Sequence, residues 1–319
     1  MDVAPDGSVA LAYYAYTARD LIVATRTASA TGWVVERVAT AADVGAGASV
    51  AIGADGTLHV SYYDLHAGRL QYARKAPGGT WTFEAVDSFN MVVSGRSSLK
   101  LDAQGHPRVA FWAHNSLRYA ERSATGWASV EVDPIAGDRP ELVLDEAGDP
   151  HITYSVSGNQ SGAALELLKY ATRSAGAWSR QNLYQSNGTA AVTESSLAFD
   201  AQGTLHVLYY ASNWLELRHL QKPAGGNWSA AMPLARPSAG DGRGMSLRLA
   251  PDGKLHGTWK TLFSREVVFA TWNAGTWSHE IVDTAPAPQA LTVLGFDANS
   301  RPHVAWWTKN PGDAVRFSR

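Results

Sequence analysis

Cysteine is absent from the 319-residue chain, which excludes disulfides, thiol catalysis and cysteine-ligated zinc. No uninterrupted apolar run reaches the roughly 18–20 residues that a membrane span needs, so none is predicted. Neither sign of charge predominates, because 27 Lys+Arg stand against 29 Asp+Glu for a net charge of −2. That balance gives no electrostatic reason to expect nucleic acid or an anionic membrane as a partner. The periodicity of amphipathic helices is also nearly absent.

Aromatic residues, by contrast, are plentiful. The chain has 12 Trp, 12 Tyr and 8 Phe, and 45% of its residues are hydrophobic. This composition supplies ample material for a packed core and argues against disorder.

Two markers recur along the chain at intervals of 43–55 residues and keep the same phase. The first is a glycine that ends a short turn: Gly7, Gly56, Gly105, Gly148, Gly203 and Gly253. In the seventh repeat Ser300 takes the place of this glycine. The second is a tryptophan that follows a Gly-containing turn: Trp33, Trp81, Trp127, Trp178, Trp228 and Trp277. Two independent markers in phase indicate a structural repeat.

Each repeat is predicted to form four short strands. In the third repeat these are Ser97–Asp102, Arg108–Ala113, Leu117–Arg122 and Trp127–Asp133, joined by Gly-containing turns and one variable loop. Four-stranded units of about 40–50 residues are typical of β-propeller blades. We therefore expect an all-β, seven-bladed propeller of antiparallel blades in one domain, with blades near 1–43, 44–92, 93–137, 138–190, 191–241, 242–286 and 287–319.

The last blade is expected to lack its outer strand, because the chain stops just after the third strand of that repeat. Either the blade is three-stranded or the chain is a fragment of a longer product. A start inside a repeat is also what removal of a signal peptide would leave, so a secreted or periplasmic bacterial location is expected. The segment Val156–Leu165, rich in Ser, Gly and Ala, is predicted to be the longest inter-strand loop.

The repeat Asp-x-x-Gly-x-x-His-Val-x-Tyr-Tyr, then Leu-x-Tyr-Ala-x-Arg and Gly-x-Trp, resembles the BNR or sialidase-like propeller repeats of secreted bacterial proteins. Clear instances are Asp200–Tyr210 and Leu70–Lys75. The segment Ser123–Trp127 keeps the Ser, Gly and Trp of the family's Asp-box but lacks its Asp. The resemblance therefore implies architecture and transfers neither sialidase activity nor its arginine triad.

A histidine recurs at the start of the second strand of most repeats: His59, His151, His206, His256 and His303. Imidazole is the commonest metal ligand, but sevenfold symmetry would separate adjacent members by roughly 8–10 Å, against Zn–N bonds of about 2.0–2.1 Å. We expect structural hydrogen bonds instead, to the turn Asp or to a backbone carbonyl, and predict no metal site.

Candidate ligand-binding residues are expected where the second strands end and the crossovers between blades begin. Aromatic residues at that strand end could stack on a sugar or pack between blades: Tyr63, Trp112, Tyr210, Trp259 and Trp307. Three crossover arginines could bind an anion or pair with local carboxylates such as Asp138 and Asp241: Arg96, Arg139 and Arg243. Asp64, His114 and Glu194 complete the predicted set by fixing hydroxyl groups.

The function expected first is binding of a carbohydrate or another small polar or anionic ligand at the mouth of the propeller channel by a monomer with no cofactor. The alternative is a hydrolase or lyase acting on a glycan, ester or phosphoester. In that case His114 or Glu194 would act as the acid or base, and a loop-held metal would assist. A third reading is a protein-interaction scaffold, which predicts an exposed apolar patch.

Overall fold

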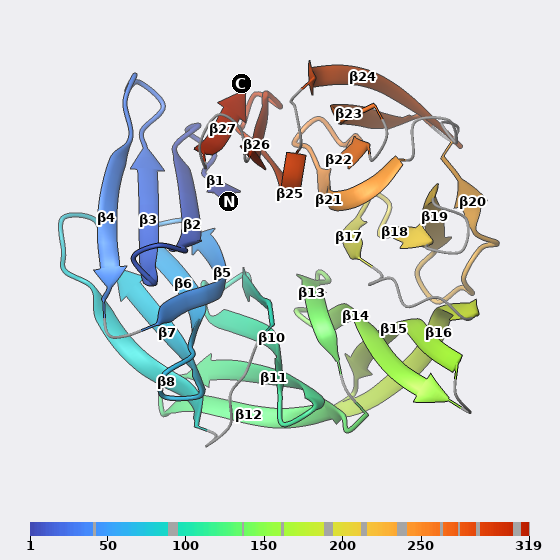
Figure 1. Cartoon of the computed structure of the whole chain (residues 1–319), viewed down its shortest axis with the longest axis horizontal. Helices are drawn as coiled ribbons and strands as arrows, with labels where there is room; N and C mark the ends of the chain where they lie inside the picture. Colours follow the sequence, from blue (N-terminus) through green and yellow to red (C-terminus); the bar gives the residue numbers. More distant parts are fainter. Residues whose placement is uncertain are drawn as a thin grey trace. The chain divides into compact units, whose positions relative to one another are not determined.

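The computed structural model describes residues 1–40, 43–88, 95–135, 137–160, 163–187, 194–211, 216–234, 241–261, 264–273, 275–284, 288–308 and 314–318. Within these residues the strands form seven separate antiparallel sheets, each following the order of the sequence (Figure 1). Six sheets have four strands and the last has three. The fold is thus an all-β seven-bladed propeller with a three-stranded last blade, which confirms the fold class predicted from the repeat.

The chain divides into two compact units, which are described separately. The first is Met1–Val156 with Lys169–Gln181, and the second is Ser157–Leu168 with Asn182–Arg319. Blades one, two and three lie in the first unit, blades five, six and seven in the second, and blade four contributes to both.

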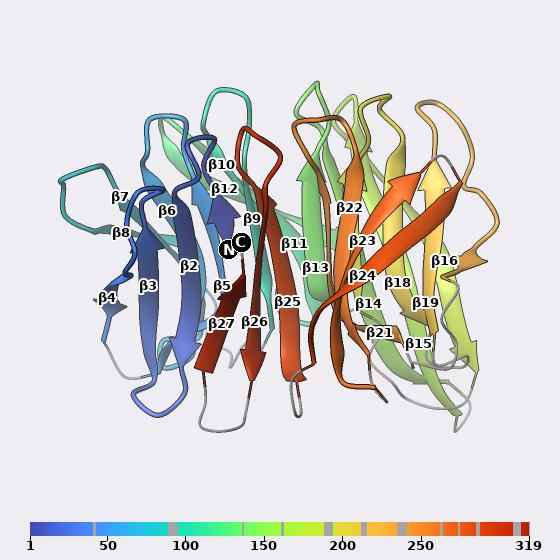
Figure 2. The ribbon, with the colours of Figure 1, turned by 90° about the horizontal axis from the view of Figure 1, so that it is seen from above.

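The first three blades have these strands: β1 (Asp2–Val3), β2 (Val9–Ala15), β3 (Asp20–Arg26) and β4 (Val34–Ala39); β5 (Val44–Ile52), β6 (Leu58–Asp64), β7 (Arg69–Lys75) and β8 (Thr82–Ser88); β9 (Ser97–Leu101), β10 (Pro107–Ala113), β11 (Ser116–Ser123) and β12 (Gly126–Asp133). In blade three the observed bounds agree with the predicted ones to within a residue at each end. In blade one, β2, β3 and β4 lie side by side (Figure 2).

The fourth blade has β13 (Asp138–Leu144), β14 (Pro150–Gln160), β15 (Ala163–Ser174) and β16 (Ala177–Asn187). The prediction of a loop over residues 156–165 is wrong, because β14 and β15 continue through most of that segment. Ser, Gly and Ala disfavour strands in isolation, but β14 and β15 are neighbours in one four-stranded sheet, and that pairing overrides composition.

The remaining blades have these strands: β17 (Ser195–Phe199), β18 (Leu205–Ala211), β19 (Glu216–Lys222) and β20 (Met232–Pro233); β21 (Asp241–Leu249), β22 (Leu255–Thr261), β23 (Glu266–Asn273) and β24 (Thr276–Thr284); β25 (Pro288–Phe296), β26 (Pro302–Thr308) and β27 (Ala314–Ser318).

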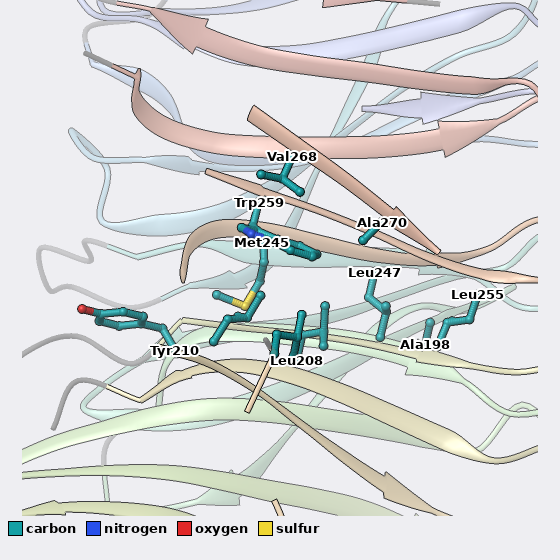
Figure 3. Packing of buried hydrophobic residues seen from close by; sticks show 11 residues of the cluster. Ala198, Leu208, Tyr210, Met245, Leu247, Leu255, Trp259, Val268 and Ala270 are labelled. Carbon is teal, nitrogen blue, oxygen red and sulfur yellow. The ribbon is translucent and has the colours of Figure 1, made fainter. Parts of the chain in front are cut away.

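The second strand of a blade is covered on both faces, whereas the outer strand is not. All seven residues of β18 and all seven of β22 are buried, while β4 is exposed at half of its positions and β24 at most of them. A strand covered on both faces shows no alternation of buried and exposed positions. Blades five and six share one apolar cluster, in which Trp259 lies beside Met245 (Figure 3).

Neighbouring inner strands are joined by a repeated hydrogen bond. A serine hydroxyl on one inner strand accepts from a leucine backbone N–H on the next. The pairs are Ser49 with Leu99 at 3.1 Å, Ser98 with Leu142 at 3.0 Å, Ser196 with Leu247 at 2.9 Å, and Ser246 with Leu294 at 3.2 Å. We call these four bonds the serine joints. Each one satisfies, between two blades, a polar group that the apolar surroundings would otherwise leave unpaired.

Candidate functional site

In blades two, four, five and six the repeated histidine lies within hydrogen-bond distance of a side chain of its own blade. In blade five, His206 Nε2 lies 3.1 Å from Asp200 Oδ2, and His206 Nδ1 lies 2.8 Å from His219 Nε2. In blade four, His151 Nε2 lies 3.4 Å from Asp145 Oδ2. These carboxylates belong to the turn Asp, as expected from the sequence. The turn Asp also accepts from backbone N–H groups of its own turn, as Asp200 does from Thr204 at 2.8 Å.

A third-strand side chain is the second partner of these histidines. His59 Nδ1 lies 2.6 Å from Tyr72 Oη, and His151 Nδ1 lies 2.6 Å from Tyr170 Oη. Burial lowers the pKa of His59 to about 4, so this imidazole is neutral at pH 7. Among the described residues, no three His, Asp or Glu side chains gather closely enough to hold a metal ion.

Three of the predicted stacking aromatics are buried: Tyr63, Tyr210 and Trp259. Tyr63 Oη donates to the backbone O of Trp112 at 3.0 Å and accepts from the backbone N–H of Trp112 at 3.1 Å. It therefore joins blades two and three, and its ring packs in their apolar cluster. Tyr210 packs closely on Gly242, where an added Cβ would lie 2.2 Å from the Tyr210 ring. These rings leave no open face on which a sugar could stack.

Trp112 differs from those three rings because it is only half-buried and packs at the margin of its cluster. The side chain of Trp307 lies outside the described residues, as does that of Arg243. Asp64 is engaged by its own loop, since Oδ1 accepts from the Ala67 N–H at 2.8 Å.

Arg96 and Arg139 occupy equivalent positions, each three residues before the leucine whose N–H enters a serine joint. Gly47 and Gly244 stand at that position in blades two and six. Gly47, Arg139 and Gly244 all have left-handed backbones, with φ of 60°, 53° and 64°. Glycine adopts this conformation freely, whereas any other residue is strained in it. Such strained residues are concentrated at functional sites. Arg139 therefore has a backbone conformation that glycine would adopt with less strain.

Residues of blades two, three and four converge around Gly95. A Cβ placed on Gly95 would lie 3.6 Å from Tyr63 Oη, 3.7 Å from Asp138 Oδ1 and 3.7 Å from Trp112 Cβ. Arg139 Nε lies 3.5 Å from Asp138 Oδ2, and both side chains are partly exposed. The predicted local pairing of Arg139 is thus present. We call Arg96, Trp112, Asp138 and Arg139 the Gly95 cluster.

The exposed turn of blade three borders this cluster. His114 and Asn115 follow directly after β10, both with left-handed backbones (φ 52° and 57°) and both exposed. Two consecutive left-handed residues form the tight hairpin turn whose twist matches the flanking strands. The turn follows Trp112 and Ala113 directly, so it places two polar side chains close beyond Trp112.

Glu194 lies in the other unit and is described with it. Its Oε2 accepts from the backbone N–H of Gly244 at 2.6 Å, so the carboxylate links the inner strands of blades five and six. That His114 or Glu194 acts as an acid or base stays a prediction.

Sequence reasoning places Tyr14 at the same strand end as the predicted aromatics but misses the polar and aromatic group around it, on blade one. Tyr16 is 84% exposed and makes an edge contact with Tyr14, with ring centroids 6.0 Å apart. Arg19 and Asp43 lie beside them. The signal was the Tyr14-Ala15-Tyr16 run, which adds a second aromatic just past the strand end.

No protein-family model matches the chain, and no curated protein matches it. Solved structures resemble it at low identity. A mutant Aleuria aurantia lectin in complex with α-methyl-L-fucoside is 16% identical, with a TM-score of 0.55 over 84% of this chain and 93% of that chain. The polysaccharide lyase Uly1 is 12% identical, with a TM-score of 0.60 over 97% and 86%.

The Hadza microbial sialidase Hz136 is 11% identical, with a TM-score of 0.58 over 93% of this chain and 73% of that chain. At these identities the likenesses show the propeller fold alone, and no specific family is shown. The part of the chain that the structure describes contains no helix long and apolar enough to cross a membrane.

Proposed function

We propose that the protein binds a glycan, and that the Gly95 cluster is a site for an acidic sugar. The observation that carries this proposal is the half-buried ring of Trp112 beside the partly exposed Asp138–Arg139 pair, with Arg96 on the adjoining strand end. An indole face suits stacking on a sugar ring. Guanidinium groups recognise carboxylate or sulfate through paired hydrogen bonds.

The charge balance of the cluster favours an acidic sugar over a neutral one. The cluster contains two arginines, Arg96 and Arg139, and one aspartate, Asp138, and guanidinium groups suit the carboxylate or sulfate of an acidic sugar. Structural neighbours whose names include a fucoside-bound lectin and a polysaccharide lyase support a glycan as the ligand class, at the level of fold.

The test is isothermal titration with uronic-acid oligosaccharides, comparing the wild type with an Arg96→Ala/Arg139→Ala variant. We expect the variant to lose about tenfold or more in affinity, as removal of a charged hydrogen bond does, while its melting temperature stays close to that of the wild type. Arg301→Ala is the control, since Arg301 is an exposed arginine of blade seven. An unchanged affinity in the double variant, or no binding of any glycan by the wild type, would refute the proposal.

A further inference from the structure

Blade one carries a second exposed group of aromatic and charged side chains, which we call the blade-one cluster: Tyr14, Tyr16, Arg19 and Asp43. The rings of Tyr14 and Tyr16 meet at an interplanar angle of 84°. Tyr16 is 84% exposed, so most of its ring faces away from the protein. An aromatic ring so open, fixed at its edge by a second ring, offers a flat apolar surface to a ligand.

The polar groups beside these rings are held in place by direct contacts. Tyr14 Oη donates to Asp43 Oδ1 at 2.7 Å. Asp43 Oδ2 lies 3.7 Å from Arg19 Nη1, which is longer than a hydrogen bond. The Arg19 side chain is 67% exposed and that of Asp43 is 30% exposed. A fixed carboxylate therefore stands next to a guanidinium at the edge of the tyrosine pair.

The backbone positions both charged residues at a conformational cost. Arg19 and Asp43 have left-handed backbones, with φ of 57° and 68°. Blade two uses Gly68, with φ of 63°, in the loop that corresponds to that of Arg19. A hydrogen bond from Val44 N–H to Arg19 O at 3.0 Å joins the two segments, and one from Leu65 N–H to Asp43 O at 2.9 Å joins the Asp43 segment to blade two. Strained residues persist when their surroundings determine them, and such residues concentrate at ligand sites.

We propose that the blade-one cluster is a second sugar site, selective for a neutral pyranose. The sugar ring would stack on Tyr16, and adjacent hydroxyl groups would donate to Asp43 and accept from Arg19. Here one carboxylate faces one guanidinium, so the pair is balanced in charge and does not attract an acidic sugar as the Gly95 cluster does. This inference rests on the proposed glycan binding and makes the chain bivalent, with one site for an acidic sugar and one site for a neutral sugar.

The test is titration with a panel of neutral methyl glycosides, using the wild type and two variants. Tyr16→Ala removes the stacking ring. Arg19→Gly removes the guanidinium while suiting the left-handed backbone, so the fold is retained. Each variant is expected to lose about tenfold or more in affinity for the neutral glycoside that the wild type binds. Phe83→Ala is the matched control, because Phe83 is another exposed aromatic, on the outer strand β8.

The outcomes separate this inference from the proposed function. Uronic-acid binding without any neutral glycoside binding would overturn the blade-one site and leave the Gly95 cluster standing. Neutral binding that survives both variants, or that is weakened equally by Phe83→Ala, would also overturn it. If the wild type binds no sugar of either kind, both proposals are wrong.

Discussion

At the scale of single residues, one repeat position shows how a buried polar side chain is satisfied in different ways. Its partner is a tyrosine hydroxyl for His59, a second histidine for His206 and a threonine hydroxyl for His256. In blade three the position holds Arg108, which donates to the turn residue Asp102 at 2.7 Å. The repeat position therefore holds a polar side chain, His or Arg, that forms hydrogen bonds near the turn. The residue type and its partner differ from blade to blade.

Acid should destabilise the protein through these buried histidines. Burial lowers the pKa of His59 to about 4 and that of His219 to about 3, whereas the unfolded side chains titrate near 6.5. Below pH 6.5 the unfolded state therefore binds more protons than the folded state, and stability is lost as the pH falls toward 4. Between pH 7.5 and pH 5 each of the two should remove on the order of 1–2 kcal/mol of unfolding free energy.

Urea unfolding at the two pH values measures this loss, and His59→Asn should make the pH dependence shallower. Asn retains a polar atom toward Tyr72 but does not titrate. Equal stability of the wild type at both pH values would contradict the role of these histidines.

At the scale of elements, the strands and turns were predictable because the repeat displays them several times over. The repeated turn glycines and tryptophans indicate where each hairpin begins and ends. The prediction of the strands therefore does not depend on any single segment. Whether an aromatic at a strand end is open to a ligand was not predictable. Tyr63 is closed off by the backbone of Trp112 in the next blade, and Tyr210 by Gly242. Those contacts lie between blades, where the spacing within one repeat carries no information.

The serine joints were not predicted, although Ser49, Ser98, Ser196 and Ser246 recur in phase with the turn glycines. A serine in an apolar inner strand is a polar residue that needs a partner. Its recurrence in phase was the available signal.

Removing one serine joint should cost more than removing an exposed serine. Ser98→Ala leaves the buried Leu142 N–H without its acceptor, so we expect a loss of about 1–3 kcal/mol in unfolding free energy. Ser123→Ala, at the exposed turn before β12, should stay within about 0.5 kcal/mol of the wild type. Chemical denaturation of the two variants makes the comparison. A similar small change in both would mean that the joint contributes nothing to stability.

At the scale of the whole molecule, protection from solvent should fall from the second strand of each blade to the outer strand. β18 and β22 are buried throughout, while β24 is exposed along most of its length. Outer strands are also hydrogen-bonded to a neighbouring strand on one side only. Hydrogen exchange followed by mass spectrometry should therefore find the amides of β18 and β22 exchanging far more slowly than those of β24. Uniform exchange across a blade would show that blades open as rigid units instead.

The serine joint has one more property, which concerns how such a chain can change over generations. In blades three and six the acceptor and the donor lie one residue apart on the same inner strand, as Ser98 and Leu99 do in blade three. A duplicate of either of these two blades would already carry the donor that bonds to the blade before it and the acceptor for the blade after it. Duplication of such a blade would therefore supply this hydrogen bond between blades together with the repeat, and no new serine or backbone donor would be needed.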